Sequence, residues 1–413
     1  MIERISTTIK GWNWTLADWS LAWILFFSVV QQRWSPIGFG IWIILALKKA
    51  RWSEWRTLLK KMFSGMSGIL IAYFLWLSIG VIWSDQNALA IGKLENKLSF
   101  ILFPLLFHFS VLKMSVKQWK FVFIAGLACV LLLNEVLAGM KCVDASSGNW
   151  IEFFSGSVFS PFMHRSYLAC YLCLGLVLLS DLKTNENKKW VLILMILFSI
   201  GVIQTLSKIG IIIWVMLLGM YVFGEVKMAS KKKQLSALAA VIGGMAMIGS
   251  VMGESIYERF NNIGQSMSEM QLYNNSTVES NAARLIMWNT SLELVKENWF
   301  WGYGTGDADL VLKTRNVALG NAGVAEEGLN SHNQFLTSWL QLGCVGIMIL
   351  IFLFIQAWRR SGNRWVESAI VTIFFLNLLV ESFLETQSGV VLFGVFMVLM
   401  FDFKNQEGQS SVV

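Results

Sequence analysis

Long apolar runs alternate with short polar connections along most of this chain, and this alternation is the feature that most constrains its fold. A membrane-spanning helix needs about 20 consecutive apolar residues. Twelve runs approach that length, and they centre on 17–31, 36–47, 66–83, 97–112, 121–140, 166–181, 190–206, 209–224, 235–252, 336–357, 366–384 and 388–403. Charged residues make up only 14% of the chain, against about 25% in soluble domains. We therefore expect an all-α, polytopic membrane bundle of about twelve transmembrane helices.

The basic residues indicate how this bundle is oriented. Five clusters of lysine and arginine flank alternate connections, within 48–61, 113–120, 183–189, 227–233 and 359–364. Such clusters mark the cytoplasmic side of a membrane protein. We therefore expect both termini in the cytoplasm and contact with membrane lipids along the spans. The net charge of +7 is explained by these clusters, so we expect no nucleic-acid partner.

One polar interval is much longer than the others, and it divides the chain into three parts. Residues 1–252 hold the first nine spans, 253–335 are the polar interval, and 336–413 hold the last three spans and a cytoplasmic tail. Connections in compact structures are usually shorter than about 12–15 residues. We therefore expect 253–335 to be a large loop on the outer, periplasmic side, forming a lid that carries an active site.

The apolar run from 190 to 223 is too long for one span. As one helix it would be ~51 Å long, whereas the hydrocarbon core measures ~30 Å. We expect two spans that reverse near 204–210, which leaves Lys208 at the outer surface. A lysine at a helix end can extend its apolar stem toward the interface, or act as a fixed cation beside an anionic substrate. Both interpretations stay open.

Four further ionisable residues fall at the expected outer ends of spans. His164 and Arg165 open the sixth span, and Glu381 and Glu385 close the eleventh, four residues apart and so on one helical face. Each could be a polar group that packs between helices. Ionisable groups in a membrane are costly and are usually functional, so their accumulation on one side favours a binding site.

The polar interval itself contains a helical pattern. Apolar residues recur at helical spacing between 280 and 297, namely Leu285, Trp288, Leu292 and Val295. This pattern predicts an amphipathic helix on the membrane surface. Arg284 falls near its beginning, where a positive charge opposes the helix dipole. Arg284 is therefore not placed there for helix stability, and it could contact either a substrate or a lipid headgroup.

A glycine-rich stretch follows this helix. Gly302, Gly304 and Gly306 predict a tight, backbone-exposed turn. It is neither a P-loop nor a dinucleotide fingerprint, because no Gly-Lys-Ser/Thr follows and no βαβ unit surrounds it. Asp307 and Asp309 form an Asp-x-Asp pattern, but no second set of metal ligands is evident. We expect Asp307 to cap the helix that follows, and we expect no metal site and no cofactor.

Four motifs point to a known family. They are Ser331-His332-Asn333-Gln334-Phe335-Leu336 with Leu342-Gly343 and Gly346; Ala283-Arg284 and Trp288 with Gly302-Tyr303-Gly304-Thr305-Gly306-Asp307; Ser207-Lys208-Ile209-Gly210; and Glu95-Asn96-Lys97-Leu98-Ser99-Phe100. Together with the span pattern, they resemble the O-antigen ligase and polymerase superfamily of bacterial envelope proteins. The family usually has arginine at the position of Lys208. Arginine can contact phosphate in a planar, bidentate manner, whereas lysine is a point charge.

The resemblance implies a fold similar to the GT-C type of metal-independent, inverting membrane glycosyltransferases. It implies transfer of a glycan from undecaprenyl pyrophosphate to an acceptor hydroxyl, at the periplasmic face of the inner membrane. The acceptor is a lipid A-core sugar for a ligase and another lipid-linked repeat for a polymerase. The sequence leaves this choice, the glycan and the oligomeric state open. A lipid-glycan transporter is the rival interpretation, but transporters place charges near the midplane and often show internal repeats.

Specific residues follow from this interpretation. His332 is expected to be the general base, because its unperturbed pKa of ~6.5 suits that role; the alternative is a loop histidine that caps the tenth span. Arg284 and Lys208 are expected to contact the pyrophosphate. The remaining substrate-binding candidates are Arg165, His164, Asn333, Glu381 and Glu385.

Overall fold

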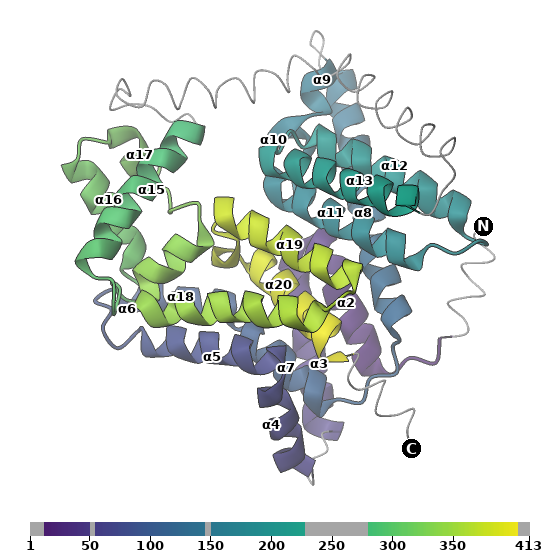
Figure 1. The fold of residues 1–413 in the computed structure, drawn as a ribbon, viewed down its shortest axis with the longest axis horizontal. Helices are drawn as coiled ribbons and strands as arrows, with labels where there is room; N and C mark the ends of the chain where they lie inside the picture. The colour runs from purple at the N-terminus through teal and green to yellow at the C-terminus, as the bar shows by residue number, and fades with distance from the viewer. Residues whose placement is uncertain (1–11, 50–53, 145–149, 228–279, 404–413) are drawn as a thin grey trace.

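A computed structural model describes residues 12–49, 54–144, 150–227 and 280–403 (Figure 1). Within these ranges the chain forms helices and no strands. The expected span at 235–252 and residues 253–279 of the expected outer loop lie outside the described residues. The all-helical prediction is therefore confirmed for the part of the chain that the structure describes.

The other eleven apolar runs coincide with helices. These are α2 (Leu16–Val30), α3 (Ser35–Lys49), α5 (Met66–Ile79), α7 (Ser99–Phe109), α8 (Val116–Asp144), α11 (Arg165–Leu182), α12 (Lys188–Gln204), α13 (Lys208–Lys227), α18 (Gln334–Ser361), α19 (Trp365–Val380) and α20 (Gln387–Phe401). In these ranges α8, α11 and α18 are long and apolar enough to cross a membrane alone. Helix α4 (Trp55–Ser64) and α5, bent by 85°, form a fourth candidate span. The other runs form shorter helices, so the number of spans stays a prediction.

The reversal expected near 204–210 is confirmed. Helix α12 ends at Gln204 and α13 begins at Lys208. Leu206 lies in the turn between them with a φ of 48°, a left-handed conformation that residues other than glycine adopt uncommonly. Gly210 then lets α13 approach α11 closely, because a Cβ there would lie 2.4 Å from Cβ of Ala169.

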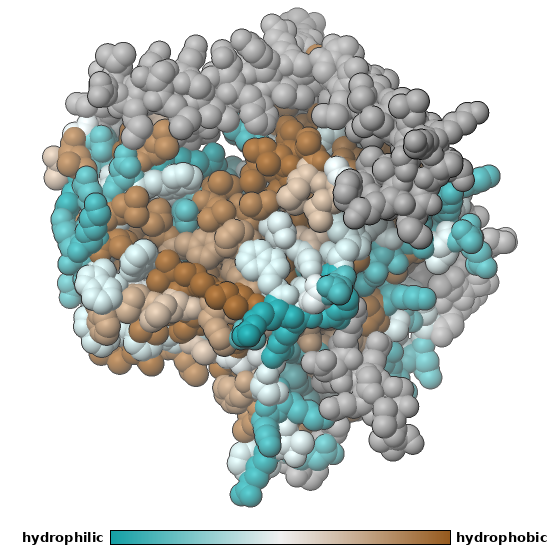
Figure 2. Space-filling view, viewed as in Figure 1, coloured by the Kyte–Doolittle hydropathy of each residue, from teal (hydrophilic) through white to brown (hydrophobic). Residues whose placement is uncertain are grey.

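The helices surround two central elements. Most residues of α11 and nearly all residues of α20 are buried, which is typical of a helix enclosed by others. Phe374 of α19 packs its ring on Phe383, Phe393 and Phe396. Figure 2 shows apolar side chains across the middle of the molecule, with polar ones over α4 and over the outer helices. This distribution suits a protein whose middle faces lipid.

A smaller group of helices gathers at one end of the bundle, beside the beginning of α18 (Figure 1). It comprises α6 (Asn87–Lys97), α15 (Ser280–Glu297), α16 (Ala308–Ala318) and α17 (Ala322–Glu326). Residues of α15, α16 and α18 share a separate apolar core, which includes Met287, Leu294, Leu312 and Leu340. These outer helices therefore dock on α18 through a core of their own.

Helix α15 has the bounds that the sequence pattern predicts, and the expected contact of its large apolar residues with a membrane surface stays a prediction. Leu292 is 43% exposed, whereas Ala283 and Met287 are buried. The side chains of α15 that face α16 and α18 include small ones, and small residues let helices approach closely. The face that docks on α16 and α18 is therefore centred on Ala283 and Met287, a face that the spacing of the large apolar residues did not indicate.

The glycine turn is buried, and the expectation of an exposed backbone is wrong. Its backbone joins α18, since Tyr303 N donates to Leu340 O at 2.7 Å and Cys344 N donates to Phe300 O at 3.1 Å. Gly343 interrupts α18 with a φ of 63°, and a Cβ there would lie 1.9 Å from Phe300 O. Only glycine permits this close approach. The turn therefore docks the outer segment, residues 280–333, on α18.

The other side of the same turn contacts the loop before α6. Gly306 N donates to Ser84 Oγ at 2.8 Å. The carboxylate of Asp307 accepts hydrogen bonds from Asp85 N at 2.6 Å and from Gln86 N at 2.8 Å. Asp307 precedes α16 but makes no side-chain hydrogen bond to it. The expectation that Asp307 caps α16 is therefore wrong, because its carboxylate binds the backbone ahead of α6.

Candidate active site

The candidate site forms where α19 ends, at the connection to α20. Helix α19 ends at Val380, Glu381 follows with extended backbone angles, and the chain then makes a short 3-10 turn, η3 (Phe383–Glu385). The prediction that Glu381 and Glu385 share one helical face is wrong, because the helix stops before both. The turn directs the two carboxylates into separate networks of partners.

Glu381 joins the outer segment to the helical bundle. Its Oε1 lies 2.7 Å from Arg284 Nη2, and its Oε2 lies 3.4 Å from His332 Nδ1. The Glu381 side chain is only 6% exposed. Burial raises the pKa of Glu381, but the hydrogen bond from His332 and the positive charge of Arg284 lower it more, so the pKa falls below its ordinary value. Glu381 is therefore ionised at neutral pH.

The position of His332 is fixed by its neighbours. Its φ of 46° is left-handed, and its backbone N donates to Asn330 Oδ1 at 2.9 Å. Asn333 Oδ1 accepts from Phe335 N at 2.9 Å and from Leu336 N at 3.1 Å, and so caps α18. The alternative that His332 caps this helix is wrong, and the structure gives Asn333, which we expected to bind substrate, a capping role.

The contact with Glu381 determines which nitrogen of His332 is available. An ionised carboxylate only accepts hydrogen bonds, so Nδ1 carries the hydrogen. In the neutral ring, Nε2 then has a free lone pair. The 3.4 Å distance between Nδ1 and Oε2 is long for a hydrogen bond, as is common for catalytic contacts before substrate binds. His332 thus has the arrangement of a general base oriented by a carboxylate.

Arg284 retains capacity for an anion. Its Nη2 donates to Glu381, but its buried Nε–H has no hydrogen-bond partner among the described residues. A guanidinium has five N–H donors, and buried donors are normally satisfied. Arg284 therefore has hydrogen-bonding capacity beyond its contact with Glu381.

The beginning of α11 lies next to this network. His164 Nδ1 accepts a hydrogen bond from Ser166 N at 3.4 Å, and the ring of Tyr167 packs on Phe383 with centroids 4.8 Å apart. Burial lowers the pKa of His164, with an opposing effect from Glu381 and further lowering by Arg284 and His332. Three of the predicted site residues therefore influence His164 electrostatically.

Arg165 and Lys208 lie at the beginnings of α11 and α13. A Cβ built on Gly156 would lie 4.0 Å from Arg165 Nη1 and 3.9 Å from Leu206 Cδ1. Arg165 is thus beside the turn that leads into Lys208. Glu381 itself contacts Arg284 and His332, and the roles of Arg165 and Lys208 in substrate binding stay predictions.

Glu385 is the centre of a second network that the sequence interpretation missed. It lies 3.0 Å from Lys97 Nζ and 3.8 Å from Lys93 Nζ. It also accepts hydrogen bonds from Gln334 Nε2 at 3.2 Å and Gln341 Nε2 at 3.1 Å. Burial raises the pKa of Glu385, but the charges of Lys97 and Lys93 lower it to about 2. The sequence contained a signal for this network, because Lys93 and Lys97 are four residues apart and lie outside the basic clusters.

The two aspartates of the Asp-x-Asp pattern have separate partners. Asp307 accepts backbone hydrogen bonds, and Asp309 lies 2.6 Å from Lys93 Nζ. In the described ranges, no three His, Cys, Asp or Glu side chains form a group that could hold a metal ion. Asp309 instead connects α16, through Lys93, to Glu385.

Comparison with known families gives a match over part of the chain. A family model described as O-antigen ligase matches residues 192–351. The matched range contains Lys208, Arg284 and His332, whereas Glu381 lies beyond it. No curated protein matches the chain. The resemblance to the O-antigen ligase and polymerase superfamily is thereby confirmed over the matched range.

Proposed function

We propose that this protein transfers a glycan from undecaprenyl pyrophosphate to a sugar hydroxyl, acting as an O-antigen ligase with a lipid A-core acceptor. The observation that supports this most strongly is the pairing of Glu381 with both Arg284 and His332. That arrangement combines an oriented base with a cation beside it. A glycosyl pyrophosphate needs both, because a hydroxyl must lose a proton while charge grows on the departing pyrophosphate.

In the proposed reaction, the acceptor oxygen attacks the anomeric carbon of the donor sugar. The bond between this carbon and the pyrophosphate oxygen breaks, and undecaprenyl pyrophosphate leaves. His332 Nε2 takes the proton of the acceptor hydroxyl. Glu381 stabilises the imidazolium that forms, through the contact at Nδ1. A single displacement of this kind inverts the anomeric configuration.

The cations around the site would bind the pyrophosphate. Arg284 would donate its unsatisfied Nε–H to an oxygen that becomes more negative as the bond breaks. Lys208 and Arg165, together with His164, would add positive charge or hydrogen bonds from the α11–α13 side. None of these steps routes through a metal, so purified enzyme should keep its rate in excess EDTA; loss of activity that Mg²⁺ or Mn²⁺ restores would contradict this.

The proposed site faces the periplasm of a bacterial inner membrane. Val317 of α16 is 60% exposed. Lys60 of α4 is also exposed, and α4 adjoins the beginning of α5, whereas the end of α5 leads to the loop that contacts the glycine turn. In a variant lacking the five native cysteines, Val317→Cys should react with a membrane-impermeant maleimide on intact spheroplasts. Lys60→Cys should react only after lysis. The reverse pattern would remove the site from its proposed substrate.

A deletion strain tests the function, and its glycans distinguish ligase from polymerase. Loss of a ligase leaves polymerised glycan on the lipid carrier. Loss of a polymerase, which shares this site and differs in its acceptor, leaves a single repeat joined to the lipid A-core. A strain in which lipid-linked glycan fails to reach the outer side of the membrane at all would support a transporter instead.

A further inference from the structure

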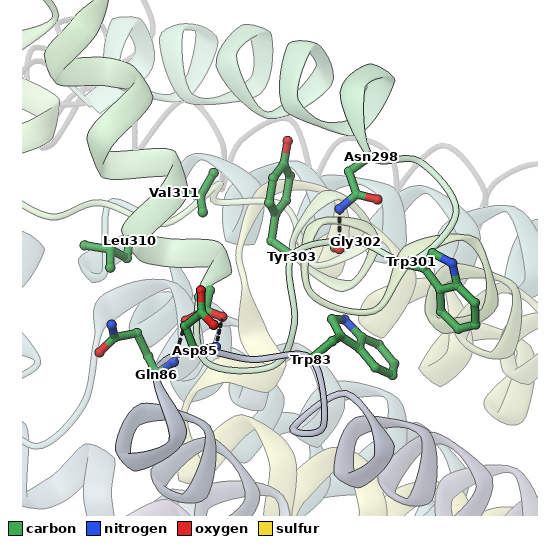
Figure 3. Close-up of a pocket in the computed structure, with 10 residues that line it drawn as sticks. Trp83, Asp85, Gln86, Asn298, Trp301, Gly302, Tyr303, Leu310 and Val311 are labelled. Atoms are coloured by element: carbon green, nitrogen blue, oxygen red, sulfur yellow. Dashed lines mark hydrogen bonds between the residues drawn. The ribbon is translucent and has the colours of Figure 1, made fainter.

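A cavity lies between the glycine turn and the loop before α6. Its volume is about 650 Å³, within the ~300–1,000 Å³ that is usual for small-molecule sites. Figure 3 shows Leu310 and Val311 of α16 on one side, with Trp83 and Trp301 on the other. None of the cavity residues belongs to the Glu381 network, so this is a separate place for a ligand.

The walls of the cavity are held by hydrogen bonds between lining side chains and the backbone. One wall is the loop of Asp85 and Gln86, whose backbone N–H groups donate to the Asp307 carboxylate. The facing wall is fixed by Asn298, whose Nδ2 donates to Gly302 O at 2.6 Å. Binding a ligand here would require little ordering of the backbone, which reduces the free-energy cost of association.

The lining combines aromatic faces with hydrogen-bonding groups. Trp83 and Trp301 lie with ring centroids 5.6 Å apart and ring planes at 65°, and Tyr303 adds a third ring. The carboxylate of Asp85 and the amide of Gln86 belong to exposed side chains on the same wall. The indole N–H of Trp83 is buried and has no hydrogen-bond partner among the described residues, although buried donors are normally satisfied.

This combination matches the chemistry of a pyranose ring. Its C–H groups form apolar faces that stack on indole rings, and its hydroxyls donate to carboxylate and amide oxygens and accept from N–H groups. We propose that the cavity lined by Trp83, Trp301 and Asp85 binds a sugar ring of the transferred or accepting glycan. This inference rests on the proposed function, and it assigns to the glycan a binding place away from the reacting atoms.

The cavity is connected to the active site by a short series of contacts. Asp307 lines the cavity, and Asp309, two residues later, pairs with Lys93. Lys93 in turn approaches Glu385, next to the connection that carries Glu381. A glycan held in the cavity would therefore be anchored to the same rigid group of helices as the catalytic residues, and binding there would position it.

The neighbouring Trp299 provides a matched control. Trp299 and Trp301 are 56% and 52% exposed, but only Trp301 lines the cavity. Exposed tryptophans also occur at membrane interfaces, where they anchor a protein. Anchoring would make the two residues equivalent, whereas sugar binding requires Trp301 alone.

The test measures binding without turnover, by titration calorimetry on purified full-length protein carrying His332→Ala. The two probes are the oligosaccharide released from the strain's lipid-linked donor and the core oligosaccharide released from its lipid A. Trp301→Ala and Asp85→Ala should each weaken binding of one probe at least tenfold, and the affected probe identifies the glycan. Trp299→Ala should leave both affinities unchanged. In otherwise wild-type enzyme, Trp301→Ala should raise KM for the same substrate and leave kcat nearly constant.

Two results would overturn the inference. One is unchanged affinity for both probes in Trp301→Ala and Asp85→Ala, in protein that stays folded. The other is an equal loss in Trp299→Ala, which would assign the tryptophans to the membrane interface. A third result would separate this inference from the proposed function. If the wild-type protein transferred no glycan while Trp301→Ala and Asp85→Ala still weakened binding as predicted, the proposed reaction would be contradicted and the sugar site would be supported.

Discussion

Arg284 and Glu381 are 97 residues apart in the sequence, and their side chains meet at 2.7 Å between Nη2 and Oε1. Arg284 lies on α15 of the outer segment, and Glu381 follows α19 of the bundle. The pair therefore exists only when α15 is docked. One N–H of this guanidinium is thereby engaged by Glu381. The outer segment contributes a charged group to the site, rather than only covering it.

The first prediction concerns the charge at Lys208. Lys208→Arg should keep most transfer activity, because it retains a cation and supplies the residue that the resembled family usually has. Lys208→Ala should lower the rate by about 10²–10³, the usual effect of removing one group that stabilises developing charge. The rate of glycan transfer by purified protein checks both. Equal rates in the wild type and Lys208→Ala would limit Lys208 to a position at the interface.

A second prediction concerns the junction between the glycine turn and α18. Gly343→Ala should destabilise the protein by roughly 2–5 kcal/mol, because it combines left-handed backbone strain with overpacking against Phe300 O. Gly92→Ala in α6 is the matched control, since a Cβ there would meet nothing within 4 Å. Thermal unfolding in detergent measures the difference. Similar unfolding temperatures for the two variants would contradict the close contact at Gly343.

The third prediction concerns pH. The pKa of Glu385 is lowered from 4.5 to about 2 in the folded protein, so its ionised form stabilises the fold above pH 4.5 and loses this effect as the pH falls toward 2. The unfolding temperature of the wild type should decrease across that interval. Glu385→Gln should unfold at lower temperature at neutral pH, because Lys97 would be buried without a carboxylate, and its pH dependence there should be flatter.

Glu297→Gln is the control for this pH experiment. Glu297 pairs with Arg315 at 2.6 Å, but its side chain is 50% exposed, and exposed ion pairs contribute little to stability. Its unfolding temperature should follow that of the wild type at every pH. If Glu385→Gln also followed the wild type, the network around Glu385 would have no role in stability.

Much of the helical architecture could be predicted from the sequence, because apolar runs report directly on burial in lipid or protein. The reversal before Lys208 and the bounds of α15 were predicted in this way. Hydropathy does not show where a helix stops inside an apolar run. Glu381 and Glu385 were therefore assigned to one helical face, although α19 ends at Val380.

The candidate site was predictable in its residue types and less so in its partners. Arg284 and His332 were identified by motif, and the structure brings both to Glu381. Lys93 and Lys97 were not identified as site residues, because their role depends on contact with Glu385, which is distant in the sequence. Lys97 and Glu385 are 288 residues apart. The hydrogen-bond partners of Asp307 were predicted wrongly, since a local pattern cannot reveal that a carboxylate binds backbone N–H groups of a distant loop.

The central claim is that Arg284 and His332, which meet at Glu381, carry out glycan transfer. The most direct test is the rate of transfer from lipid-linked glycan to acceptor by purified, folded variants. Arg284→Ala should be slower by about 10²–10³ and His332→Ala by about 10²–10⁴. Arg315→Ala, which removes an arginine paired with Glu297 on the same outer segment, should match the wild type. Near-wild-type rates in both Arg284→Ala and His332→Ala would contradict the account.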